Sequence, residues 1–237
     1  MLTVNNICFG YGRRKVLDSV SFDAAAGEIV GIVGANGTGK TTLLRILATV
    51  LPPESGTVSL NGLDSYVDRD AMRRLLGFLP ERCPLYDSMS VREYLRYRGQ
   101  LKGERFLRLR RSLKDVMTAF GLDPVSEKTI GTLSAGYRKR IGLADAVLGA
   151  PKLLLLDDPF AGLDPETQRI MGGFLSDLSS RSAVIVSGHS LDVMCEFCNR
   201  FIVLREGCPA EFLNTVEELP AEFIAKLRKL LTTKEAV

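Results

Sequence analysis

The sequence predicts an α/β fold built on a mostly parallel sheet, and three observations support this class. Four short apolar runs of strand length occur at residues 28–33, 153–156, 183–186 and 201–204. Patterns typical of amphipathic helices lie between these runs, and strands that are apolar throughout are typical of a sheet covered on both faces. The chain has 237 residues, of which 46% are hydrophobic and 25% charged. This composition fits one large domain and excludes a disordered or fibrous protein.

Two other parts of the chain differ from this core pattern. Residues 1–30 and 56–63 carry alternating short strands broken by turns, which predicts a small antiparallel β flank. The tail from Pro220 places apolar residues on one helical face, so we expect a helix that packs against the rest of the chain. The apolar residues of this face are Phe223, Ile224, Leu227, Leu230 and Leu231.

Residues 87–150 have a helical pattern and are expected to form a subdomain inserted into the core. The first helix begins at Ser90, which has the spacing of a capping box with Glu93. Apolar residues then recur at steps of three and four, and Gly121 supplies a stop. These apolar residues are Phe106, Leu109, Leu113, Val116, Met117 and Phe120.

Charge, hydropathy and cysteines exclude several classes of protein. A net charge of +3 is too small to indicate nucleic-acid binding. No uncharged apolar stretch is long enough to span a bilayer, and residues 1–10 lack a secretory signal, so we expect a cytosolic chain. Cys195 and Cys198 form a CxxC, but His189 is the sole histidine and no second cysteine pair exists. Core packing is therefore favoured over zinc binding.

Residues 34–41 fit the phosphate-loop pattern GxxxxGK[ST] and lie between a predicted strand and a predicted helix. Glycines let consecutive backbone amides face phosphate oxygens, and the helix N-terminus adds partial positive charge. Lys40 is expected to reach the β- and γ-phosphates of ATP, and Thr41 to bind Mg²⁺. The predicted fold is therefore an α/β P-loop NTPase core with a mostly parallel sheet covered by helices, an antiparallel β flank and an inserted helical subdomain. The residues expected to hold the phosphates are Gly34, Ala35, Asn36, Gly37, Thr38, Gly39, Lys40, Thr41 and Thr42.

A second motif is an apolar strand that ends in two carboxylates, Asp157 and Asp158. In an α/β sheet of this kind, the carboxyl ends of the strands lie beside the phosphate loop. Asp157 is expected to bind Mg²⁺, and Asp158 to orient or deprotonate the water that attacks the γ-phosphate.

Together with residues 132–140, these motifs resemble the ATP-binding subunit of an ABC transporter over nearly the whole chain. Residues 133–137 (LSAGY) resemble the family signature LSGGQ and begin a helix with Ser134 at its N-cap. The resemblance implies a single ABC ATPase domain over residues 1–237. Its parts would be a nucleotide-binding core with the β flank (1–86 and 151–215), a helical signature subdomain (87–150) and a C-terminal helical tail (216–237).

The resemblance also implies that two chains share each ATP, as a homodimer or as a heterodimer with another ABC ATPase subunit. Ser134, Ala135 and Gly136 would meet the γ-phosphate held by the other subunit. Asp164 would lie in the D-loop, which crosses the same interface.

Three further residues resemble family positions around the nucleotide. Tyr11 matches the aromatic residue on which adenine stacks, and Val16 would border the ribose. His189 resembles the switch histidine that contacts the γ-phosphate and the attacking water.

Four positions depart from the family pattern. Glu81 stands where the family has a glutamine, so contact with Mg²⁺ or water remains open for it. The signature has Ala135 and Tyr137 in place of glycine and glutamine. Asp158 replaces the usual catalytic glutamate and is one methylene shorter, and a misplacement of about 1 Å can cost on the order of 10²-fold in rate. We therefore expect slow ATP hydrolysis.

The implied partner is a separate integral membrane permease, which would hold the chain peripherally on the cytoplasmic face of the membrane. The alternative is an ABC-type regulatory ATP switch with little hydrolysis, which Asp158 and Glu81 favour. Residues 92–114 contain nine basic and two acidic residues. A solvated helical face, a permease contact and a contact with anionic lipid headgroups are all open for this cluster, and the scarcity of interleaved aromatics disfavours nucleic acid.

Overall fold

The computed structural model describes residues 1–205, 210–214 and 220–232. Its centre is a six-stranded sheet with the order β10-β9-β3-β8-β7-β6, in which all neighbours are parallel except the edge pair β10 and β9. This sheet confirms the predicted α/β class. Its strands are β3 (Ile29–Gly34), β6 (Leu76–Leu79), β7 (Leu153–Asp157), β8 (Ala183–Ser187), β9 (Arg200–Leu204) and β10 (Glu211–Asn214).

The central strands are apolar throughout because both of their faces are covered. In β7, Leu154 and Leu156 belong to the core on the side of the helical layer, whereas Leu153 and Leu155 belong to the core on the side of the β flank. Successive side chains of a strand point to opposite faces, so each residue of β7 fills one of the two cores. Strand β10 was not predicted, because four residues at a sheet edge carry little pattern.

The antiparallel β flank is confirmed as a second sheet with the order β2-β1-β4-β5. Helix α1 (Lys40–Leu47) packs between the two sheets, and its buried residues belong to the same core as the flank. Helix α2 (Arg69–Arg74) follows the flank and was not predicted. The strands of the flank are β1 (Leu2–Tyr11), β2 (Arg14–Ala24), β4 (Ser55–Leu60) and β5 (Leu63–Asp64).

The inserted helical subdomain is formed by α3 (Val91–Leu101), α4 (Phe106–Ala119) and α5 (Ala135–Val147), with short 3₁₀ turns at Asp123–Val125 and Ile130–Thr132. The capping box at Ser90 and Glu93 is present in both directions. Phe106 shares the periodicity of the buried residues of α4, but it is 77% exposed because it lies at the first helical position, beyond the packed face.

Three more helices cover the face of the central sheet opposite the β flank: α6 (Pro165–Ser179), α7 (Leu191–Cys195) and α8 (Pro220–Thr232). The predicted docking of the tail is confirmed, because Phe223 and Leu227 are buried and the Phe223 ring packs against Phe201 of β9. Residues 216–219 and 233–237, and the side chains of Leu230 and Leu231, lie outside the described residues.

Cys198 is buried and Cys195 is half-buried against the core around α7, as expected for packing residues. Across the described ranges, no helix combines the length and the apolar character that crossing a bilayer requires.

Candidate functional site

A cavity of about 500 Å³ lies where the parallel strands end, and it gathers most of the predicted nucleotide residues. The strands that reach it are β3, β7 and β8, whose C-terminal ends lead into the phosphate loop, the acidic pair and the histidine segment. The residues lining it are Tyr11, Arg14, Val16, Asn36, Gly37, Gly39, Lys40, Thr41, Thr42, Glu81, Asp157, Asp158, Ser187 and His189. Gly34, Ala35 and Thr38 form the rest of the loop.

The phosphate loop has a backbone that requires glycine. Gly39 adopts φ +103° at the N-cap of α1, a left-handed conformation that side chains rarely adopt. A Cβ atom at this position would also lie 2.8 Å from the side chains of both Val16 and Leu17. Thr38 is buried, and its Oγ1 donates to the Ala35 carbonyl oxygen at 2.9 Å. The loop is thus held in shape by contacts within this chain.

Lys40 folds back over the loop. Its Nζ donates to the carbonyl oxygens of Gly34 at 2.7 Å and Ala35 at 2.9 Å. Burial lowers the pKa of the Lys40 ammonium, and nearby carboxylates, Asp157 first, oppose that effect. Because the hydrogen bonds of this buried ammonium go to neutral carbonyl groups, binding of an anion next to it would be favourable.

Asp157 is a buried carboxylate with one free oxygen. Its Oδ1 accepts a hydrogen bond from Ser187 Oγ at 2.6 Å, while Oδ2 is buried and has no hydrogen-bond partner among the described residues. An unsatisfied buried carboxylate oxygen is costly unless a cation meets it. Hard oxygen donors such as this one and the nearby Thr41 hydroxyl fit Mg²⁺.

Asp158 has an unusual backbone conformation, with φ +47°. Two contacts hold it: the Asp158 amide donates to Ser187 Oγ at 3.1 Å, and Lys139 Nζ of α5 donates to the Asp158 carbonyl oxygen at 2.8 Å. Burial raises the pKa of the Asp158 carboxyl, although nearby His189 and Lys139 act in the opposite direction. Sequence reasoning missed Ser187 and Lys139, because a serine and a lysine carry no motif of their own.

Tyr11 and Val16 border the cavity on the side of the β flank. Tyr11 is 52% exposed, and its ring packs edge-on against the Phe9 ring with 5.0 Å between the ring centroids. The Tyr11 OH lies 3.4 Å from Thr42 Oγ1. Sequence reasoning missed Arg14, whose Nη2 would lie 3.3 Å from a Cβ atom on Gly37. A basic residue three positions after the aromatic residue was the available signal.

Glu81 and His189 lie on the remaining walls. Glu81 follows β6, His189 follows β8, and both side chains are exposed at the cavity. The structure therefore brings both of them together with the acidic pair.

The signature residues are not among those lining this cavity. Ser134 is the N-cap of α5, and its exposed Oγ accepts from the Tyr137 amide at 3.5 Å. Asp164 is the N-cap of α6, and its carboxylate accepts from the amide and the hydroxyl of Thr167 at 2.9 and 2.7 Å. Ser134, Ala135 and Asp164 are exposed and Gly136 is half-buried.

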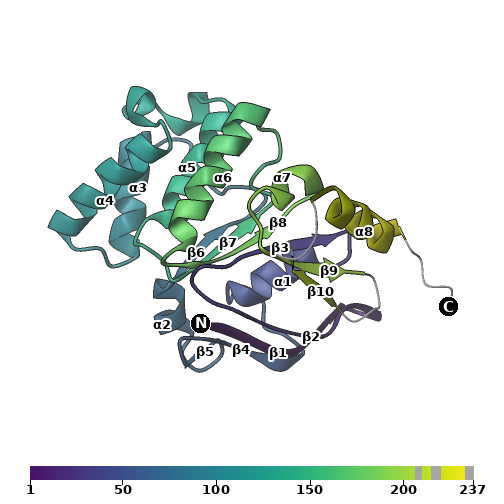
Figure 1. The fold of residues 1–237 in the computed structure, drawn as a ribbon. Coiled ribbons are helices and arrows are strands. Elements are labelled where there is room, and N and C mark those ends of the chain that lie inside the picture. The colour runs from purple at the N-terminus through teal and green to yellow at the C-terminus, as the bar shows by residue number, and fades with distance from the viewer. Residues whose placement is uncertain (206–209, 215–219, 233–237) are drawn as a thin grey trace.

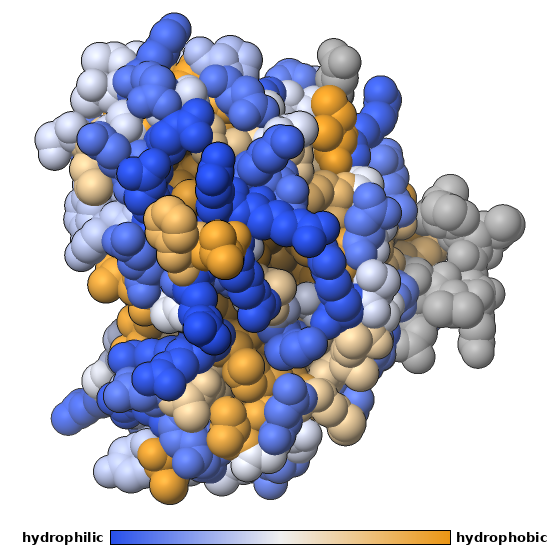
Figure 2. All heavy atoms as spheres, turned by 90° about the vertical axis from the view of Figure 1, so that its left-hand side faces the viewer, coloured by the Kyte–Doolittle hydropathy of each residue, from blue (hydrophilic) through white to orange (hydrophobic). Residues whose placement is uncertain are grey.

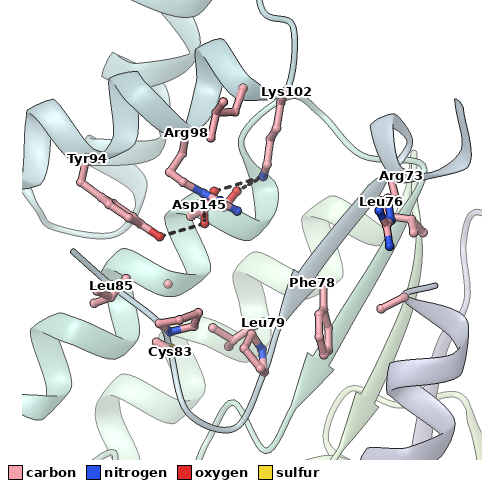
Figure 3. Close-up of a pocket in the computed structure, with 15 residues that line it drawn as sticks. Arg73, Leu76, Phe78, Leu79, Cys83, Leu85, Tyr94, Arg98, Lys102 and Asp145 are labelled. Carbon is pink, nitrogen blue, oxygen red and sulfur yellow. Dashed lines mark hydrogen bonds and ion pairs between the residues drawn. The ribbon is translucent and has the colours of Figure 1, made fainter. Parts of the chain in front are cut away.

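A second cavity, of about 460 Å³, lies between the central sheet and the helical subdomain (Figure 3). Its buried carboxylate, Asp145 of α5, meets three side chains of α3 and the turn that follows it, although Oδ1 accepts no hydrogen bond within the described residues. Asp145 Oδ2 accepts from Tyr94 OH at 3.1 Å and from Arg98 Nε at 2.9 Å, and Lys102 Nζ lies 3.3 Å from Oδ1. Two members of the basic cluster therefore face inward, so the cluster is not the uniform solvated face that was one interpretation of it.

The same segment lines both cavities. Glu81 lines the first cavity, whereas its neighbours Pro80, Cys83 and Leu85 line the second one. A contact in the second cavity would therefore act on the segment that carries Glu81.

Comparison with known proteins decides the family. The family model described as "ABC transporter" matches residues 17–161, which is more than half of the chain. The chain belongs to the ABC transporter family. It is accordingly an ATP-binding cassette of P-loop fold in the ABC ATPase family, as the resemblance of its motifs predicted.

Individual relatives agree with this assignment. The chain is 33% identical over 207 residues to the uncharacterized ABC transporter ATP-binding protein YxlF of Bacillus subtilis, covering 87% of this chain and 68% of that protein. A solved structure described as the ATP-binding subunit of an ABC transporter matches 98% of this chain and 100% of its own, with TM-score 0.89 and 25% identity. The structure of cbiO1 from Clostridium perfringens, described as part of the ABC transporter complex cbiONQ, matches 97% of this chain and 93% of its own, with TM-score 0.79 and 26% identity.

Proposed function

We propose that this ABC cassette hydrolyses ATP with Mg²⁺ at a site shared by two subunits and thereby drives a separate membrane permease. The observation that carries the proposal is the single cavity in which the phosphate loop, the acidic pair, Tyr11 and His189 meet. The proposal includes the division into a core with β flank (1–86 and 151–215), a helical subdomain (87–150) and a tail (216–237).

The nucleotide would lie along the cavity from Tyr11 to the phosphate loop. Adenine stacks on the exposed Tyr11 ring, and Val16 borders the ribose. The phosphates face the amides of residues 34–39 and the N-terminus of α1, which carries Thr41 and Thr42. Lys40 leaves its two carbonyl partners for the β- and γ-phosphate oxygens, because a charge-assisted hydrogen bond is stronger than a neutral one.

Mg²⁺ would be held by Asp157 and Thr41, with Glu81 as a further oxygen donor. The free Oδ2 of Asp157 supports this role. Bound there, Mg²⁺ would neutralise charge that develops on the phosphate oxygens.

Asp158 would accept the proton of the water that attacks the γ-phosphorus, releasing ADP and phosphate, and His189 would orient the γ-phosphate. The left-handed backbone at position 158 supports the choice of aspartate, because Asp tolerates positive φ better than Glu does. The shorter side chain still reaches the water less well, so we propose slow turnover.

The site would be completed by a second subunit, identical or homologous. Ser134, Ala135 and Gly136 lie at an exposed helix start outside the cavity of their own chain, which supports their use across an interface. Asp164 would lie at the same interface. ATP between the two subunits would favour the dimer, because it binds the closed form only.

The permease would place a cytoplasmic segment in the second cavity and hold the chain at the cytoplasmic face of the membrane. The lining is rich in apolar residues and includes Arg73, whose hydrogen bonds go to neutral groups of Thr49, so it fits an apolar segment with an acidic side chain near Arg73. The segment of residues 80–85 would then relay contact there to Glu81.

The test of nucleotide binding is Lys40→Ala, with Lys102→Met as the matched control from the second cavity. We expect Lys40→Ala to weaken ATP binding by about 10²-fold, since it removes charge-assisted hydrogen bonds worth roughly 1.5–3 kcal/mol. Lys102→Met should leave ATP affinity unchanged. Equal ATP affinity of Lys40→Ala and the parent in equilibrium titrations would refute the proposed site.

A regulatory ATP switch with little hydrolysis is the second candidate, favoured by Asp158. The two functions differ in their partner. A membrane permease recovered with the native chain supports transport, whereas a soluble partner alone supports regulation.

A further inference from the structure

The tip of the α3–α4 hairpin exposes large apolar side chains. Leu101 at the end of α3 is 59% exposed, and Phe106 and Leu107 at the start of α4 are 77% and 80% exposed. Further along α4, by contrast, Leu109 and Leu113 are buried. The apolar tip is therefore not part of the core, and nothing in the described chain covers it.

Basic side chains without acidic partners surround this tip. Arg92 and Arg108 are paired with Glu127 and Glu104. The remaining exposed cations of the hairpin form no ion pair within the described part of the chain. These unpaired residues are Arg96, Arg105, Arg110, Arg111 and Lys114.

Two of the unpaired cations lie on the same side of α4 as part of the apolar tip. Leu107, Arg111 and Lys114 are spaced i, i+4 and i+7, which places them on one outward stripe of α4. Asp115 is the one exposed acidic residue of that helix, and it forms no ion pair there. Figure 2, which views the molecule from the side of α3 and α4, shows hydrophobic patches surrounded by hydrophilic residues.

A second exposed apolar pair shows that exposure alone does not indicate binding to an anionic membrane. Tyr66 and Val67 are each 79% exposed, about as much as the hairpin pair. The surrounding residues 64–74 contain three aspartates and three arginines, so this pair lacks the surplus of positive charge that the hairpin has. Of these two exposed pairs, the one at the hairpin tip combines apolar side chains with a surplus of positive charge, the properties that hold a protein segment at an anionic bilayer.

We propose that the tip of the α3–α4 hairpin binds directly to the anionic headgroups of a lipid bilayer, with Phe106 and Leu107 inserted below the phosphates. This contact requires neither ATP nor a permease, so its failure would leave the proposed function untouched. Leu101 also lines the second cavity, so the membrane contact lies next to the surface proposed for the permease.

The test is flotation of the full chain with phosphatidylcholine vesicles, with and without phosphatidylglycerol. We expect binding only when phosphatidylglycerol is present, and weaker binding as salt is added. The triple variant Arg110→Gln, Arg111→Gln, Lys114→Gln should lower the partition coefficient on the order of 100-fold, since each basic residue near an anionic surface contributes roughly fivefold. Its matched control changes three exposed cations outside the hairpin: Lys152→Gln, Arg169→Gln and Arg181→Gln.

Insertion of the apolar side chains is tested by a separate variant with its own matched control. Phe106→Ser with Leu107→Ser should weaken binding about tenfold or more, whereas Tyr66→Ser with Val67→Ser should leave it unchanged. All these side chains are exposed, and retained ATP binding verifies that each variant is folded. No binding to phosphatidylglycerol vesicles, binding that survives either hairpin variant, or equal loss in the controls would overturn the proposal. So would salt-sensitive binding to a DNA duplex with none to vesicles.

Discussion

The two cavities are similar in size, about 500 and 460 Å³, and each contains a buried carboxylate near cations, yet they differ in how that carboxylate is satisfied. Asp145 is engaged by three side chains of the α3 region. Asp157 has one hydrogen-bond donor and a free oxygen, while Lys40 is turned back onto carbonyl groups. Asp145 also has an oxygen without a hydrogen bond, but the Lys102 ammonium lies 3.3 Å from it, whereas Asp157 forms no ion pair within the described residues. The difference is that a cation of the chain compensates the charge of Asp145, while the charge of Asp157 favours a cation from outside.

The largest expected effect is on protein stability, where the two carboxylates should differ most. Asp145→Asn leaves Arg98 and Lys102 without their carboxylate and should lower the free energy of unfolding by about 3–5 kcal/mol. Asp157→Asn keeps an oxygen facing Ser187 and removes a poorly satisfied charge, so it should change that free energy by no more than about 1 kcal/mol. Urea unfolding without nucleotide measures both. Equal losses would mean that the two carboxylates do not differ as described.

The next effect concerns the length of the side chain at position 158, which we propose as the catalytic base. Asp158→Glu should raise single-turnover hydrolysis by up to about 10²-fold, because the longer side chain reaches the water. It should also cost some stability, since position 158 has φ +47°. Equal hydrolysis rates, measured at saturating ATP with equal ATP affinity, would defeat the proposal that turnover is slow.

A smaller effect tests the framework of the nucleotide cavity. Ser187→Ala removes the hydroxyl that donates to Asp157 and accepts from the Asp158 amide, so hydrolysis should fall about tenfold. The control is Ser182→Ala on the same segment, which breaks a bond to the Pro151 carbonyl oxygen. Both variants should lose stability, and only Ser187→Ala should lose rate. A matching loss of rate in Ser182→Ala would assign the effect to the fold.

The smallest effect is on pH dependence. Burial raises the pKa of Asp158, so its protonated form persists to higher pH than in an ordinary aspartic acid. Because the base must be unprotonated, single-turnover hydrolysis should fall with decreasing pH above the ordinary value of 3.8. ATP affinity measured at each pH separates binding from chemistry. A rate that stays constant down to that ordinary value would contradict the assignment.

The meeting of the predicted site residues in one cavity could be expected because the motifs that carry most of them are each local in sequence. Residues 34–42 form one continuous loop and helix start, and Asp157 and Asp158 end an apolar strand. Parallel strands bring such ends to one edge of the sheet, so topology alone predicts that the two motifs meet.

The second cavity could not be predicted in this way. Asp145 is distant in sequence from Tyr94, Arg98 and Lys102, and it lies in a helix whose buried face shows no motif. In the sequence, the basic residues of α3 form one charge cluster. Only the packing of the structure shows which of them face the interior and which face the surface. Ser187 and Lys139 were missed for a related reason, since their role depends on contacts with Asp158.

The most direct test of the shared site is the mass of the Asp158→Asn protein by light scattering, with and without ATP and Mg²⁺. The account predicts one chain without nucleotide, twice that mass with ATP, and a return to one chain when Ser134→Arg is added. A single chain at high ATP and protein concentration, or an ATP-dependent dimer that tolerates Ser134→Arg, would contradict it.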